Sequence, residues 1–114
     1  MSHASNSAAA AGRYRRQLTP KQMEAEVYGR ATRALREAVD HESPVILARA
    51  LADNRRLWDA VLSAVVDPSN QLPVPLRAQL ASVARSVLRE CDSEVPDTDH
   101  IIEINEQIAA ALWA

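Results

Sequence analysis

The chain has 114 residues, a net charge of −2 and a hydrophobic content of 47%. This length allows one domain, and the apolar content is sufficient for a core. The longest apolar runs are far shorter than the ~20 residues that a membrane helix requires, which excludes membrane insertion.

The composition favours helices. Phe is absent and aromatic residues make up only 4% of the chain, so the core must consist mainly of Leu, Val, Ile and Ala. Ala and Leu are strong helix formers, and only 2 Gly interrupt the chain. A single cysteine, Cys91, cannot form an internal disulfide, and the N-terminus does not resemble a signal peptide. We therefore expect a cytoplasmic protein.

The N-terminal residues differ from the remainder. Residues 1–18 are rich in Ala, Ser and Arg and lack apolar periodicity, which predicts a mobile N-terminal arm. Residues 19–114 are expected to form a single helical domain.

Two cap-and-proline signals predict the first two helices. Thr19-Pro20 precedes apolar residues at four-residue spacing, namely Met23, Val27, Ala31, Leu35 and Val39. Ser43-Pro44 repeats the signal, and Asp67-Pro68 ends the second helix. The second stripe comprises Leu47, Leu51, Asn54, Leu57, Trp58, Val61, Leu62 and Val65.

Two further helices follow an ordered loop at 67–73. Pro73 and Pro75 introduce a helix whose apolar stripe is Leu76, Leu80, Val83, Ala84, Val87, Leu88 and Cys91. After a polar connection near 92–97, Asp97 or Thr98 caps a helix with the stripe Ile101, Ile104, Ile108 and Leu112. Four amphipathic helices joined by short loops predict an all-α fold, a small helical bundle.

No group of residues indicates catalysis. Asp97, Asp99, His100 and Glu103 could in principle surround a metal ion, but a solvated first helical turn favoured by the helix dipole is the better interpretation. Cys91 falls on an apolar stripe, where a free cysteine commonly acts as a small buried hydrophobe. A glycine-rich phosphate loop is also missing. We therefore expect no enzyme activity, no metal and no cofactor.

Nucleic-acid binding is also disfavoured. Arginines occur on the outer faces of the first two helices, as Arg30, Arg33, Arg36 and Arg49. Acidic residues are interleaved with them, the sequence pI is about 5.9, and stacking aromatic residues are few. A solvated face with ion pairs explains these arginines better.

Asn54 and Asn105 interrupt two apolar stripes, and a buried amide needs hydrogen-bond partners. The preferred interpretation is that both side chains tie loops to helices, with the 67–73 connection as one candidate. The alternative is that they line a groove for a partner. Trp58 is likewise expected in the core rather than as an anchor for a partner, although Trp is enriched at binding hot spots.

Several tags together resemble a known family. Four tags in the chain resemble, in order and spacing, the FlaF flagellar biosynthesis regulators of alphaproteobacteria. They are Thr19-Pro20-Lys21 through Thr32-Arg33-Ala34-Leu35, then Asn54 to Trp58, then Asn70-Gln71-Leu72-Pro73 with Leu76-Arg77-Ala78, and last Ile102 to Asn105. The resemblance covers residues from about 19 to 114.

The resemblance implies a cytosolic protein that binds flagellin and supports its secretion and filament assembly as an export chaperone. The alternative that it implies is a regulator of flagellin translation, acting on flagellin messenger RNA directly or with a FlbT-type regulator, the second expected partner. The candidate residues for partner binding are Tyr14, Asn54, Arg55, Arg56, Trp58, Asn70, Leu72 and Asn105.

Overall fold

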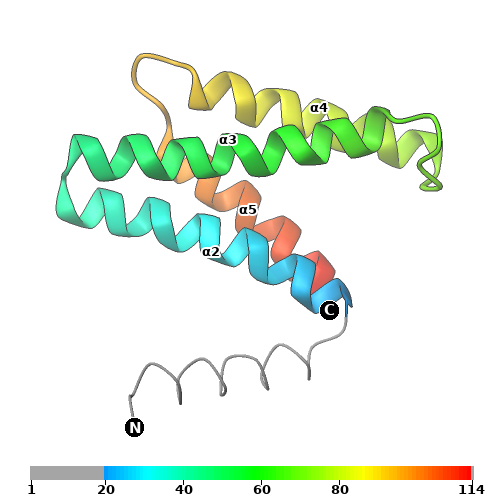
Figure 1. Ribbon diagram of the computed structural model, residues 1–114, viewed down its shortest axis with the longest axis horizontal. Helices are drawn as coiled ribbons and strands as arrows, with labels where there is room; N and C mark the ends of the chain where they lie inside the picture. Colours follow the sequence, from blue (N-terminus) through cyan, green and yellow to red (C-terminus); the bar gives the residue numbers. More distant parts are fainter. Residues whose placement is uncertain (1–19, 114) are drawn as a thin grey trace, which may run out of the picture.

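The computed structural model describes residues 20–113 as four helices without strands (Figure 1). Their bounds are α2, Pro20–His41; α3, Pro44–Val66; α4, Val74–Cys91; and α5, Thr98–Trp113. The predicted all-α bundle and the positions of its three connections are therefore confirmed. The predicted arm at 1–18 lies outside the described residues.

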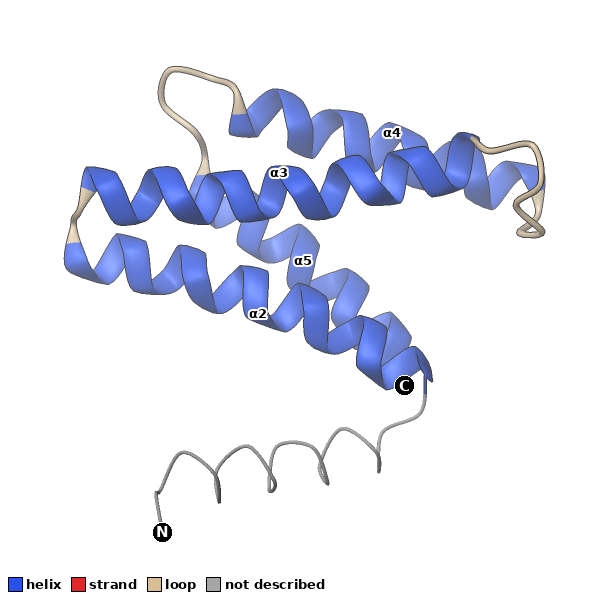
Figure 2. Cartoon of the chain, in the orientation of Figure 1, coloured by secondary structure: helices blue, strands red, loops and turns tan. Residues whose placement is uncertain are grey.

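The helices form two pairs, α2 with α5 and α3 with α4, and the two pairs are joined by packing of α2 on α3. The closest backbone packing joins α2 to α5, α3 to α4, and α2 to α3. In Figure 2, α3 and α4 form a hairpin whose connecting loop projects beyond the ends of α2 and α5. The region where α2, α3 and α5 meet is therefore enclosed by neighbouring helices, whereas no other helix packs beside the α3–α4 loop in this view.

The helix ends follow the local sequence. The Ser43 hydroxyl accepts a hydrogen bond from the backbone N–H of Ile46 at 3.3 Å, and Pro44 occupies the first turn of α3. Asp97 caps α5, because its carboxylate accepts from the backbone N–H of His100 at 3.1 Å. Glu42 adopts φ 51°, the left-handed conformation that reverses the chain between α2 and α3. The Ser43 cap was expected from the sequence, and Asp97 was one of the two residues, with Thr98, expected to cap the last helix.

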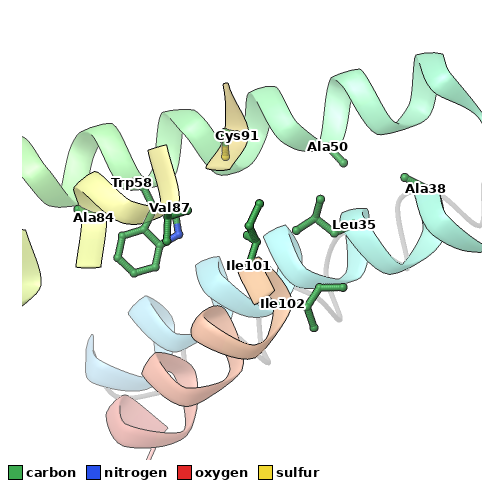
Figure 3. Packing of buried hydrophobic residues seen from close by; sticks show 9 residues of the cluster. All are labelled: Leu35, Ala38, Ala50, Trp58, Ala84, Val87, Cys91, Ile101 and Ile102. Atoms are coloured by element: carbon green, nitrogen blue, oxygen red, sulfur yellow. The ribbon is translucent and has the colours of Figure 1, made fainter. Parts of the chain in front are cut away.

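The core consists of aliphatic and small side chains around one tryptophan. Figure 3 shows Trp58 of α3 close to Ala84 and Val87 of α4, with Ile101 of α5 and Leu35 of α2 in the same cluster. Trp58, Leu35 and Ile101 are all fully buried. Burial of such side chains contributes about 1.5–3 kcal/mol each, so this cluster dominates the favourable energy of the fold.

Three apolar residues assigned to the buried stripes are exposed. Val27 and Val39 of α2 are 40% and 45% exposed. Each four-residue step turns a helix by about 400°, so residues at this spacing drift away from the buried face. Leu76 is 41% exposed because the first turn of α4 lies at the projecting end of the hairpin. Small residues, including Ala25 and Ala38, occupy the buried face of α2 instead.

Candidate functional site

Two asparagines and a tryptophan form a hydrogen-bonded chain in the interior. The indole N–H of Trp58 donates to Asn105 Oδ1 at 2.9 Å, and Asn105 Nδ2 donates to Asn54 Oδ1 at 2.7 Å. Asn54 Nδ2 in turn donates to the carbonyl oxygens of Ala50 at 2.8 Å and Ala31 at 3.2 Å. This asparagine network (Asn54, Trp58 and Asn105) therefore connects α2, α3 and α5.

All three side chains of the asparagine network are fully buried. The asparagines join helices to one another, so the expectation that they tie the 67–73 loop to a helix was wrong. The core position expected for Trp58 is confirmed, and its ring also meets Tyr28 edge-on at 5.7 Å between ring centroids. In this conformation a partner has no surface of these residues to contact, and their proposed role in partner binding stays a prediction.

Arg55 and Arg56 lie next to the asparagine network in sequence but point outward. The Arg55 guanidinium pairs with the carboxylate of Asp92 and donates to the backbone carbonyl of Cys91, which fixes the end of α4 against α3. Arg56 pairs with Asp53 on the same helix. Both arginines are accessible, and both already have a carboxylate partner within the chain.

The loop between α3 and α4 is ordered by its own side chains. Asn70 Nδ2 donates to the carbonyl of Ala64 at 2.8 Å, and Asn70 Oδ1 accepts from the backbone N–H of Leu72 at 2.9 Å. Hydrogen bonds from the backbone and hydroxyl of Ser69 hold the pKa of Asp67 below its usual value. Leu72 is 42% exposed. Asn70 therefore shapes a turn that presents Leu72 to solvent.

Two of the expected site residues are accordingly on the surface of one loop, Asn70 and Leu72, and three are in the interior. Tyr14, the remaining aromatic candidate, lies outside the described residues. The structure does not bring these candidates together into one surface.

A different feature of the surface is a groove between two helices. A groove between α4 and α5 is lined by Ser82, Val83, Ser86, His100, Ile104, Gln107 and Ile108. We call it the α4–α5 groove. Val83, Ile104 and Ile108 are half-buried and pack against the core on one side. Their other side lines the groove, so they form its apolar floor. The polar residues of the lining, Ser82, Ser86, His100 and Gln107, form the rim of the groove.

The sequence contained a signal for this groove. Val83, Ile104 and Ile108 belong to the predicted apolar stripes, and the lining of the groove adds two serines that no sequence prediction included. Ser82 and Ser86 are four residues apart and therefore lie on one edge of α4, next to Val83. Small polar residues along the edge of an apolar stripe leave part of that stripe uncovered.

Burial shifts the pKa of two side chains with ionisable S–H or O–H groups in the described part of the chain. Burial raises the pKa of the Cys91 thiol, which favours its unreactive neutral form. Burial likewise raises the pKa of the Tyr28 hydroxyl. Within residues 20–113, no group of three or more His, Cys, Asp or Glu side chains is placed to hold a metal ion. Among the same residues, no helix combines the length and apolar character needed to span a membrane.

The described residues thus form an all-α bundle with an open, partly apolar groove between α4 and α5. A family model described as flagellar protein FlaF matches residues 7–112, and the chain therefore belongs to the FlaF family. The resemblance found in the sequence is confirmed, and the protein is flagellar-related. Comparison with curated proteins and with solved structures gave no match.

Proposed function

We propose that the chain binds flagellin and accompanies it to secretion, holding an amphipathic segment of flagellin in the α4–α5 groove. The observation that carries the proposal is the groove itself, an apolar floor contributed by two helices and bordered by polar side chains. The family supplies the flagellar context. Such a complex would keep apolar segments of flagellin from associating before export.

The chemistry of the groove suits an amphipathic helix. Ile104 and Ile108 are one turn apart on α5, and Val83 faces them from α4. An incoming helix can place apolar residues at matching one-turn intervals on this floor, as in other helix-in-groove complexes. Ser82 and Gln107 at the rim can then hydrogen-bond to its polar flanks.

The core below the groove favours a preformed site. Asn105 of α5 is hydrogen-bonded to Trp58 and Asn54 of α3, and α4 packs on α3 along its length. Both walls of the groove are therefore attached to α3. A wall that is already fixed loses little conformational freedom on binding, which improves affinity.

The translation-regulator alternative has weaker support on the described surface. Arg36 pairs with Glu106 at 2.9 Å, and Arg55 and Arg56 also have carboxylate partners. Phosphate contacts would have to compete with these pairs. We therefore infer that Arg36, Arg55 and Arg56 belong to an ionic surface rather than to an RNA site.

The proposal is tested by binding of purified flagellin, or of peptides from its two ends, to matched variants. Ile108→Glu places a charge on the groove floor, and Leu72→Glu places the same charge on the exposed α3–α4 loop. We expect Ile108→Glu to weaken binding at least tenfold and Leu72→Glu to leave it within about twofold, since burying an unpaired charge costs several kcal/mol. Circular dichroism establishes that both variants remain folded.

A second groove variant covers the case in which Ile108→Glu unfolds. Ser82 is exposed at the rim, so Ser82→Arg should obstruct the groove without disturbing the core. If folded Ser82→Arg and Ile108→Glu keep full affinity and Leu72→Glu loses binding, the flagellin site lies on the α3–α4 loop and not in the groove. Absence of binding by the unsubstituted protein would overturn the proposal.

A further inference from the structure

The α4 edge of the α4–α5 groove is basic. Arg85 is exposed and follows the groove residue Ser82 by three positions. Arg89 is also exposed and follows the groove residue Ser86 by three positions. Residues three positions apart are neighbours on the surface of a helix, so both arginines lie along the edge of the groove that the two serines begin.

The α5 edge of the groove is acidic. Glu103 is exposed, and it lies between His100 and Gln107 on the helix surface, three positions after the first and four before the second. Gln107 Nε2 donates to Glu103 Oε1 at 3.5 Å, which places the carboxylate beside the rim. Glu106 belongs to the other side of α5, where it pairs with Arg36 of α2. Glu103 is therefore the carboxylate of this edge.

These edge charges are not used within the described part of the chain. The ion pairs among the described residues join other side chains, namely Arg36–Glu106, His41–Glu37, Arg55–Asp92 and Arg56–Asp53. Glu90, the acidic neighbour of Arg89, instead accepts a hydrogen bond from the backbone N–H of Asp97 at 2.6 Å. Arg85, Arg89 and Glu103 are thus available to charges on a molecule in the groove.

We propose that the α4–α5 groove selects an amphipathic helix with carboxylates along one polar flank and Lys or Arg along the other. The acidic flank faces Arg85 and Arg89 on α4, and the basic flank faces Glu103 on α5. The apolar stripe between the flanks covers the groove floor. This inference rests on the proposed function and names the charge pattern of the flagellin segment that the groove accepts.

The edges also fix the direction of the bound helix. A helix that keeps its apolar stripe on the floor but runs the opposite way exchanges its two flanks. Its carboxylates then face Glu103, and its basic residues face Arg85 and Arg89. Like charges placed opposite each other disfavour that arrangement, so one direction is preferred.

Reversal of the α4 edge tests the charge pattern, with a flagellin peptide that binds the unsubstituted protein. We expect Arg85→Glu combined with Arg89→Glu to weaken binding about fivefold at low salt, because attraction becomes repulsion. At about 0.5 M salt the difference should fall below about twofold, since exposed charges are then screened. Fluorescence anisotropy of the labelled peptide measures both affinities.

The matched control makes the same change of net charge away from the groove. Arg33 of α2 and Arg49 of α3 are exposed and form none of the ion pairs of the described residues. Arg33→Glu combined with Arg49→Glu should leave the affinity within about twofold. Equal losses in the edge and control variants would overturn the inference, because net charge alone would then explain them.

A reciprocal change in the peptide covers the case in which the edge variant is damaged. A peptide whose flank carboxylates are replaced by Lys should bind the Arg85→Glu, Arg89→Glu variant at least about threefold more tightly than it binds the unsubstituted protein. No such preference would overturn the charge pattern. If Ile108→Glu abolishes binding while edge reversal has no effect, the proposed function stands and the charge pattern is wrong. Failure of every flagellin peptide to bind the unsubstituted protein would contradict the proposed function, and this inference with it.

Discussion

The interior where α2, α3 and α5 meet and the projecting α3–α4 loop each depend on asparagine, with opposite consequences. Asn54 and Asn105 are fully buried and bond to each other and to Trp58, so they connect three helices. Asn70 bonds to backbone groups within six residues of itself and lies at the surface. The same side chain therefore organises tertiary packing in one region and a local turn in the other.

The difference shows where the fold is sensitive to change. A buried amide that loses its partner cannot turn to water, whereas an exposed amide can. The interior network should therefore behave as one cooperative unit, and the loop should tolerate substitution. The following variants measure that difference.

The largest effect is expected for Asn105→Ala. The substitution leaves the indole N–H of Trp58 and Asn54 Oδ1 without their partners and opens a small cavity. We expect a loss of about 3–5 kcal/mol in the free energy of unfolding. Urea unfolding followed by circular dichroism measures it. Gln107→Ala on the same helix is the exposed control, with an expected loss under about 0.5 kcal/mol.

A double-mutant cycle with Asn54→Ala and Asn105→Ala extends this test. Because the two side chains share a hydrogen bond, their effects should deviate from additivity by at least about 1 kcal/mol. Additive effects within about 0.3 kcal/mol would mean that the two asparagines stabilise the bundle independently.

A smaller effect is expected for Asn70→Ala. Its two hydrogen bonds to the backbone are replaced by water, so the free energy of unfolding should fall by about 1 kcal/mol. The same urea experiment applies. A loss as large as that of Asn105→Ala would remove the contrast between the two regions.

The smallest effect concerns Asp67, which is fully exposed at the same loop. Its folded pKa is lowered by hydrogen bonds from Ser69, so its contribution to stability is present above the unfolded pKa and is lost as the pH falls through the folded value. When the pH is lowered from 7 to about 3, the free energy of unfolding should therefore fall slightly more in the unsubstituted protein than in the Asp67→Asn variant. Parallel urea curves at the two pH values provide the comparison, and equal losses would contradict this role of Ser69.

Most of the fold could be predicted from the sequence because its signals are local. Ser43-Pro44 and Asp67-Pro68 mark helix ends by backbone chemistry alone, and the apolar stripe of α3 is buried or half-buried along its whole length. Asp97 was one of two candidate caps, with Thr98, from their place before an apolar stripe, and the structure shows that Asp97 is the cap. These predictions required no knowledge of which helices are neighbours.

The candidate site was predicted less well because it depends on tertiary contacts. The sequence shows that Asn54 and Asn105 interrupt apolar stripes, but they are 51 residues apart and their hydrogen bond exists only once α3 and α5 pack together. Similarly, the half-exposed state of Ile104 and Ile108 depends on how closely α4 approaches α5. Periodicity identifies an apolar face and does not say how much of it a neighbour covers.

The most direct test of the account is calorimetry of flagellin with the purified protein at two temperatures and two salt concentrations. Burial of an apolar helix face in the α4–α5 groove predicts binding without nucleotide, metal or RNA, a negative heat-capacity change and only a mild loss of affinity with salt. A complex with nucleic acid would instead weaken steeply with salt as counterions are released. No heat with flagellin, together with tight and salt-sensitive binding to flagellin messenger RNA, would contradict the account.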